Sequence, residues 1–186
     1  MRKLSMAELN RKSVQQFREA AKNPIVVVLE NIRSMHNVGS VFRTADAFLI
    51  NKIILTGYTP APPHRDIEKT ALGATDSVSW TYEKDTLAAI RQLSQEGYRL
   101  LAVEQVEGST PLNTFRDEAG EPLAVIFGNE VTGVSDEVLK ECSGSIEIPQ
   151  AGIKHSLNIS VAAGIVLWEL VRSRINVSAH DNQNGK

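Results

Sequence analysis

The chain has 186 residues, of which 42% are hydrophobic and 23% charged, so one globular domain with a substantial core is expected. A formal net charge of −2 argues against a protein that coats nucleic acid, so any basic binding surface has to be local. One cysteine and four scattered histidines exclude a disulfide framework and offer no metal-ligand spacing, so no metal is expected. The start of the chain lacks the apolar stretch of a secretion signal, and no run could span a membrane, so the expected location is cytoplasmic.

Residues 1–22 are predicted to form a basic N-terminal helix ahead of the main domain. Ser5 and Glu8 have the spacing of a capping box, so the helix should begin there and run to about Ala21. Basic residues gather toward both of its ends: Arg2, Lys3, Arg11, Lys12, Arg18 and Lys22. The segment is therefore either a solvated surface helix or a basic arm that contacts a polyanion.

Between residues 23 and 176, apolar runs typical of buried strands alternate with helical patterns. The predicted elements, in chain order, are a strand at 24–30, a helix that carries Arg43, a strand at 52–57, a proline-rich loop at 59–66, a weak strand at 78–82, a helix at 85–96, strands at 98–104 and 122–128, a short helix capped by Ser135, a strand at 145–149 and a helix at 156–174. The polar tail, 177–186, is expected to be flexible. This order predicts an α/β domain with a mainly parallel sheet and helices on both faces.

The helix after the first strand, within NIRSMHNVGSVFRTADAF at 31–48, has a polar start and carries one cation. Its apolar residues recur at the spacing of a helix packed on a core: Val38, Val41, Phe42, Ala45, Phe48 and Leu49. We expect Gly39 to leave room for a ligand at the helix start, where free backbone N–H groups favour an anion. Arg43, one turn on, would add a fork-shaped cation for a phosphate. The alternative is a surface ion pair between Arg43 and Asp46.

A second polar loop, IFGNEVTGVS at 126–135, follows a buried strand. Because ligands of parallel sheets bind beyond the carboxyl ends of the strands, the residues after Glu30, Glu104, Gly128 and Pro149 should lie near one another. The spacing of the loop matches neither a phosphate-binding P-loop nor a dinucleotide motif. An idle carboxylate is costly after a buried strand, so Glu130 is either functional or bonded to backbone N–H groups.

The third stretch, IPQAGIKHSLNISVAAGI at 148–165, leads into the apolar last helix. Ser156 is the expected N-cap of that helix. Asn158 is a poor helix former in the first turn, which indicates that its amide binds something. Lys154 and His155 add a local positive spot, and His155 is either an exposed loop residue or a general base.

The order and spacing of the three stretches are more specific than any one of them. The patterns are N-x-G-x-x-x-R-x-A-D-A-F at 37–48, F-G-N-E-x-x-G-V-S at 127–135 and I-P-x-x-G-x-x-x-S-L-N-x-S-V-A-A-G at 148–164. Together they resemble the three motifs of the SpoU (TrmH-type) RNA ribose 2′-O-methyltransferases, over about residues 24–174. The resemblance implies S-adenosylmethionine as the methyl donor, a SPOUT-type fold with a C-terminal trefoil knot, and a homodimer with its active site at the subunit interface. The apolar last helix is consistent with a dimer surface.

The resemblance also assigns roles by position. Arg43 matches the catalytic arginine, and the catalytic candidates are Arg43, Glu130, Asn158 and Ser156. The candidates for cofactor binding are Val103, Glu104, Gly128, Ile148, Ser156 and Leu157. The candidates for RNA binding are Asn37, Arg43, Lys154, Arg11 and Lys12. Gln150 departs from the family pattern, because many members have methionine there.

Methyl transfer to a ribose hydroxyl is an in-line displacement, so the protein must align the two reactants and help to remove a proton. The resemblance makes the arginine the general base, but a guanidinium stays protonated in proteins. We therefore expect Arg43 to bind the phosphate next to the target ribose and to stabilise alkoxide charge, while the proton leaves through that phosphate or a water. Glu130 is expected to orient Arg43 or the Asn37 loop, and Asn158 to fix the cofactor or the ribose.

The expected substrate is tRNA, because only the basic segment precedes the core where many rRNA-modifying relatives carry an extra RNA-binding domain. Single-stranded or loop RNA is favoured, since the bases of an RNA helix are hard to reach. The alternatives are an rRNA methyltransferase and an RNA-binding relative without catalysis, although intact Arg43, Glu130 and Asn158 argue against the latter. A dehydrogenase-like nucleotide-binding domain would need a glycine-rich turn after the first strand, which LENIRSMHN lacks.

Overall fold

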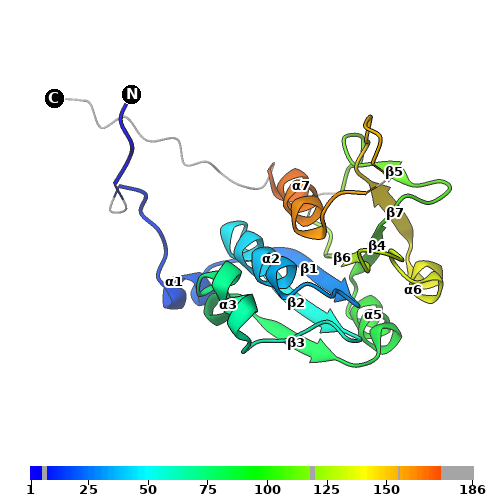
Figure 1. Cartoon of the computed structure of the whole chain (residues 1–186), viewed down its shortest axis with the longest axis horizontal. Helices are drawn as coiled ribbons and strands as arrows, with labels where there is room; N and C mark the ends of the chain where they lie inside the picture. The colour runs from blue at the N-terminus through cyan, green and yellow to red at the C-terminus, as the bar shows by residue number, and fades with distance from the viewer. Residues whose placement is uncertain (6–7, 118–119, 155, 173–186) are drawn as a thin grey trace.

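The computed structural model describes residues 1–5, 8–117, 120–154 and 156–172. Its described strands form one sheet in the order β3-β2-β1-β6-β4-β7-β5, which Figure 1 shows from β3 at the bottom to β5 at the upper right. Every neighbouring pair is parallel, so the predicted parallel α/β sheet is confirmed. The strands are β1 (Asn23–Glu30), β2 (Ile50–Thr56), β3 (Trp80–Glu83), β4 (Arg99–Val103), β5 (Thr110–Pro111), β6 (Leu123–Phe127) and β7 (Gly144–Glu147).

Helices cover both faces of the sheet, as predicted, because alternate side chains of each strand point to opposite sides. Ile25, Val27 and Leu29 of β1 pack in one apolar core, and Val26 and Val28 pack in the other. The first core contains residues of α1 (Val14–Glu19), α2 (Met35–Ala47), α3 (Arg65–Ala71), α4 (Ala74–Ser77) and α7 (Ile159–Val171). The second contains residues of α5 (Thr86–Gln95) and α6 (Asp136–Glu141). No helix within the described ranges is long and apolar enough to cross a membrane.

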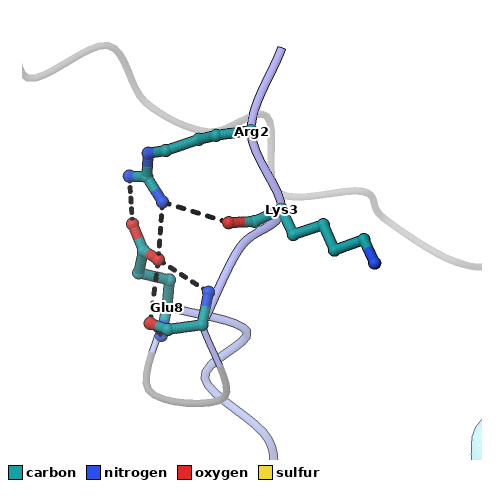
Figure 2. A network of polar contacts seen from close by, with 4 residues as sticks. Arg2, Lys3 and Glu8 are labelled. Atoms are coloured by element: carbon teal, nitrogen blue, oxygen red, sulfur yellow. Dashed lines mark hydrogen bonds and ion pairs between the residues drawn. The ribbon is translucent and has the colours of Figure 1, made fainter.

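The predicted N-terminal helix from Ser5 to Ala21 is wrong, because only Val14–Glu19 forms α1. The capping box that starts this helix is made by Ser13 and Gln16. Glu8 does accept hydrogen bonds from the Ser5 N–H and hydroxyl, at 2.7 and 2.8 Å, and it also pairs with Arg2 (Figure 2). That local network does not continue into α1, and Asn10 adopts a left-handed conformation with φ 46° before it.

The short helix α1 is docked on the rest of the domain. Phe17 is buried in the first core, and the Arg18 guanidinium donates to the Asp76 carbonyl at the end of α4, at 2.5 and 3.2 Å. The Lys22 ammonium donates to the carbonyls of Ala20 and Phe17, which closes the C-terminal end of the helix. Arg18 and Lys22 therefore serve the fold. Arg11 and Lys12, just before α1, are exposed.

Other boundaries also differ from the predictions. The proline-rich stretch at 59–66 ends in α3, which begins at Arg65 with His64 as its N-cap, and α3, α4 and the two-residue strand β5 are not in the sequence-based expectation. The last helix starts at Ile159, and its N-cap is Asn158 rather than Ser156. The predicted flexible tail and the trefoil knot stay predictions, and residues 177–186 lie outside the described part of the chain.

Gly39 has a packing role in place of the predicted ligand role. It is buried where α2 crosses α3, and a Cβ there would lie 2.2 Å from both the Ile67 carbonyl oxygen and the Thr70 hydroxyl oxygen. The absence of a side chain therefore allows the two helices to approach closely. The expectation that Gly39 leaves space for a ligand is wrong, because α3 fills that space.

Candidate active site

A cavity of about 350 Å³ lies beyond the carboxyl ends of β4, β6 and β7. Its walls come from the loops that follow these strands and from the start of α7. The residues predicted to hold the cofactor all line it: Val103, Glu104, Gly128, Ile148, Ser156 and Leu157. Residues from four distant parts of the sequence thus meet at one edge of the sheet, where parallel sheets bind ligands.

The loop after β6 folds back on itself to form one wall of this cavity. The Asn129 N–H donates to the Gly133 carbonyl at 3.0 Å, and the Gly133 N–H donates back to the Asn129 carbonyl at 2.9 Å. A Cβ on Gly128 would lie 2.1 Å from backbone atoms of Gly133 and Val134, so the wall has no space for a side chain there. The Glu104 carboxylate accepts a hydrogen bond from the Val134 N–H at 3.1 Å, which holds the far end of the loop.

One chain of hydrogen bonds joins the three motifs beside the cavity. Asn158 Oδ1 accepts from the Ser160 N–H and hydroxyl, at 2.9 and 2.6 Å. The Asn158 Nδ2 therefore faces Asn37 and donates to its Oδ1 at 3.1 Å. The Asn37 Nδ2 in turn donates to Glu130 Oε1 at 3.2 Å. The side-chain amides of Asn158 and Asn37 thus both donate toward Glu130, and the series of hydrogen bonds ends on the Glu130 carboxylate.

Glu130 is ionised at neutral pH and acts as an acceptor. Partial burial raises the pKa of Glu130, but hydrogen bonds from its own backbone N–H, from the Arg33 N–H and from the Asn37 amide outweigh burial, so the pKa lies below its usual range. The Arg33 N–H lies 3.3 Å from Oε2. Of the two predicted roles, these bonds favour the one in the Asn37 loop, and within the described residues Glu130 forms no hydrogen bond or ion pair with Arg43.

The lowered pKa predicts a pH-dependent effect of Glu130→Gln on stability. A carboxyl whose pKa is depressed by folding contributes stability above its unfolded pKa, and the contribution is lost as the pH falls through the folded pKa. We expect the variant to be less stable than wild type above pH 4.5, the ordinary value for this group, and the difference to shrink toward acid. Urea unfolding at a series of pH values measures this.

Glu107→Gln is the matched control, since Glu107 is an exposed loop glutamate. Its free energy of unfolding should follow wild type at every pH. A difference between Glu130→Gln and wild type that stays constant from neutral to acid pH would contradict the assigned hydrogen bonds.

Arg43 lies on an exposed part of α2 and does not line the 350 Å³ cavity. It lines a second cavity of about 510 Å³ between α2, α3 and α7, together with Lys69, and an adjoining one of about 690 Å³, together with Arg11 and Lys12. Asp46 accepts a hydrogen bond from the Ser77 hydroxyl at 2.6 Å and forms no ion pair with Arg43 in the described part of the chain. The alternative interpretation of Arg43 as one half of that ion pair is therefore wrong.

The remaining predicted residues are more dispersed. Lys154 is exposed and lines none of the three cavities described here, and His155 lies outside the described residues. The described residues also contain no group of histidine, cysteine or carboxylate side chains that could hold a metal ion. Asn129 and Ser160 belong to the quoted motifs, but the sequence analysis assigned neither of them a role. The turn-forming Gly-Asn pair was the available signal for Asn129, and Ser160, two residues after an N-cap asparagine, has none.

Known proteins provide an independent comparison. A sequence model of the SpoU rRNA Methylase family matches residues 24–168. The chain is 31% identical over 175 residues to a tRNA (guanosine(18)-2′-O)-methyltransferase of Thermus thermophilus. The matched region covers 94% of this chain and 88% of that protein. It is 30% identical over 168 residues to a 23S rRNA (guanosine-2′-O-)-methyltransferase of Vibrio parahaemolyticus. This match covers 90% of this chain and 67% of that protein.

Solved structures agree with this assignment. An rRNA methyltransferase from Sinorhizobium meliloti with bound AdoMet has a TM-score of 0.76 at 30% identity; the match covers 84% of this chain and spans 60% of the length of that protein. A TrmH/SpoU tRNA modifying enzyme from A. aeolicus shares the fold, with a TM-score of 0.76 at 24% identity over 87% of this chain and 82% of that one. The predicted resemblance is confirmed: the chain belongs to the SpoU rRNA methylase family of S-adenosylmethionine-dependent RNA 2′-O-methyltransferases.

Proposed function

We propose that this protein transfers a methyl group from S-adenosylmethionine to a ribose 2′-hydroxyl of an RNA, with tRNA as the favoured substrate. The observation that carries this proposal is the hydrogen-bond chain from Asn158 through Asn37 to Glu130, which ties the three motifs together beside the cofactor-sized cavity. A cytoplasmic location fits such a substrate.

The cavity suits S-adenosylmethionine in size and chemistry. Its volume lies in the range of small-molecule sites, and apolar side chains line it next to exposed backbone: Phe127, Val131, Ile148, Leu157, Ile159 and Ala162. Gly128 lets the loop after β6 fold closely onto the backbone of Gly133 and Val134, which shapes this wall. When bound there, the cofactor supplies an electrophilic methyl group, and the chain supplies orientation. Ser156 and Asn158 stand at the entry of α7, next to this wall, and are proposed to orient the reactants.

Arg43 is proposed to bind the phosphate beside the target ribose and to stabilise the negative charge that develops on the 2′-oxygen. The guanidinium keeps its proton, and the hydroxyl proton leaves through the bound phosphate or a water. Because Arg43 does not line the cofactor cavity of its own chain, we propose that it serves the cavity of a second subunit in a homodimer.

The outer face of α7 supports this homodimer. Val161, Ile165 and Trp168 recur at helical spacing and are 49%, 38% and 50% exposed, an unusual density of apolar surface on one helix. Leu157, which lines the cofactor cavity, continues the same surface at 39% exposed. A second copy packed on this face would cover the apolar residues and bring another chain to the edge of the cavity.

The two cavities that share Arg43 form the proposed RNA-binding groove. Lys69 lines one of these cavities, and Arg11 and Lys12 line the other. The groove therefore presents four cations against two carboxylates, those of Asp46 and Asp76, although the whole chain is acidic. Such a local basic track fits the backbone of an RNA. Lys154 and Asn37 are proposed to add contacts nearer the ribose.

The groove predicts a change in the salt dependence of RNA binding. We expect the double variant Arg11→Ala/Lys12→Ala to bind tRNA more weakly and to lower the slope of log K against log salt by about 1 to 2, since each lost phosphate contact removes about 0.7 to 0.9. Filter binding at several salt concentrations measures it. The control Lys84→Ala/Lys140→Ala removes exposed lysines outside the groove and should keep the wild-type slope. Equal slopes for both double variants would contradict the groove.

The substrate is tested with purified protein, labelled S-adenosylmethionine, total tRNA and, separately, rRNA. Label in tRNA that resists alkaline cleavage at one site supports the proposal, because a 2′-O-methyl group blocks attack on the neighbouring phosphate. Label in rRNA alone would indicate that the protein is an rRNA methyltransferase, the first alternative. Bound cofactor and bound RNA without label would indicate the non-catalytic relative.

A further inference from the structure

Asn129, in the middle of the loop that walls the cofactor cavity, depends on residues outside the three motifs. The residue is only 5% exposed, and its side chain makes four hydrogen bonds. Two of them stay within the loop: Asn129 Oδ1 accepts from the N–H groups of Val131 and Thr132, at 2.8 and 3.1 Å. These bonds fix the turn that carries Glu130, and Asn129, Glu130, Val131 and Thr132 all line the cavity.

The other two bonds of Asn129 reach the neighbouring strands. With Oδ1 engaged in the turn, Nδ2 points the opposite way and donates to the Asn31 carbonyl at 2.8 Å and to the Tyr58 hydroxyl oxygen at 2.6 Å. Asn31 follows β1, and Tyr58 lies two residues after β2. The Tyr58 N–H also donates to Asn31 Oδ1 at 3.2 Å. The loops after β2, β1 and β6, which are neighbours in the sheet, are therefore tied together at Asn129.

Tyr58 is the member of this cluster whose hydroxyl can be removed without disturbing the core. The residue is 56% exposed, and its hydroxyl accepts from the amide of Asn129, a buried residue. Loss of that acceptor would leave one Asn129 N–H without a partner where water has little access, and an unpaired buried donor is costly. The expected response is a shift of Asn129, which would release the Val131 and Thr132 N–H groups and loosen the cavity wall.

We propose that Tyr58 is a positioning residue for the cofactor cavity and acts through Asn129; the inference rests on the proposed function. Tyr58→Phe removes the hydroxyl and keeps the ring. A single hydrogen bond of this kind changes affinity by about threefold to tenfold. The expected result is a rise of that size in the dissociation constant and the KM for S-adenosylmethionine. The KM for RNA should stay at the wild-type value, and the melting temperature should fall no further than that of the control variant described next.

The chain offers a matched control in Tyr98→Phe. The Tyr98 hydroxyl also accepts from an asparagine amide, that of Asn51 at 3.0 Å, but it lies at the amino ends of β2 and β4, away from the cavity. The control loses the same kind of bond and should keep the wild-type affinity for the cofactor. Calorimetry gives the dissociation constants, and steady-state kinetics separates the two KM values from kcat.

Amide hydrogen exchange tests the same inference without the cofactor. The Val131 and Thr132 amides should exchange faster in Tyr58→Phe than in wild type and at the wild-type rate in Tyr98→Phe. Unchanged exchange and a cofactor affinity within twofold of wild type would overturn the proposal, as would a change confined to the KM for RNA. If wild type itself bound no cofactor, the proposed function would fail, and the exchange rates would still decide the role of Tyr58.

Discussion

Arg43→Ala is expected to lower kcat for methyl transfer by about 10³-fold, the scale seen when a group that stabilises transition-state charge is removed. The affinity for S-adenosylmethionine should stay the same, because Arg43 is assigned to the RNA phosphate and the 2′-oxygen and not to the cofactor. Arg43→Lys should recover only part of the rate, since an ammonium keeps the charge but lacks the two-pronged geometry that matches a phosphate. Single-turnover kinetics with saturating cofactor measures the chemical step.

The control for this prediction is Arg91→Ala. Arg91 is an arginine of α5, in the second core layer across the sheet from α2, and its partner is Glu141. Its removal should leave both rate and cofactor affinity unchanged. If Arg43→Ala kept more than about a tenth of the wild-type rate, Arg43 would not stabilise transition-state charge, because the loss of such a group lowers the rate by more than about tenfold.

Gly128→Ala is expected to weaken the binding of S-adenosylmethionine by about 10- to 100-fold, the equivalent of a typical overpacking cost. The added methyl group would lie 2.1 Å from backbone atoms of Gly133 and Val134, so the folded-back loop has to move away from its position. Equilibrium dialysis with labelled cofactor measures the affinity, and thermal unfolding reports the accompanying loss of stability.

Gly152→Ala is the matched change, because a Cβ on Gly152 meets nothing within 4 Å. It should bind the cofactor like wild type. If Gly128→Ala bound the cofactor as tightly as Gly152→Ala does, the cavity beyond β6 would not be the cofactor site.

Much of the fold could be predicted from the sequence because the buried strands carry strong local signals. The apolar runs at 24–30 and 122–128 match β1 and β6 to within a residue or two. The N-terminal helix failed because Ser5 and Ser13 both begin capping patterns, and propensity alone does not choose between them. The helix α3 was missed because the prolines before it are typical of a loop, and its N-cap, His64, directly follows the last of them.

The sequence singled out candidate residues for the site but could not reveal the contacts between them. Glu130 and Asn158 stand out locally as polar groups at costly positions, yet their shared partner Asn37 is about 90 to 120 positions away in the chain. Gly39 was assigned to a ligand because its packing partner, α3, could not be seen from the sequence. Tyr58 lies in no motif, and its contact with Asn129 depends on the strand order, which periodicity does not reveal.

The central claim is that Arg43 of one subunit and the cofactor cavity of its partner form one active site, and mixing two defective variants tests it most directly. Arg43→Ala lacks the cation. Gly128→Ala binds the cofactor weakly, so its cavity stays empty when the cofactor concentration is kept low. After the subunits have been exchanged, methyl transfer to RNA should return to about a quarter of the wild-type rate, because half of the dimers hold one site free of both defects. Mixing Arg43→Ala with the double variant Arg43→Ala/Gly128→Ala should restore nothing. If the first mixture also stayed inactive although mixed dimers had formed, Arg43 would act within its own chain, and the shared site would be contradicted.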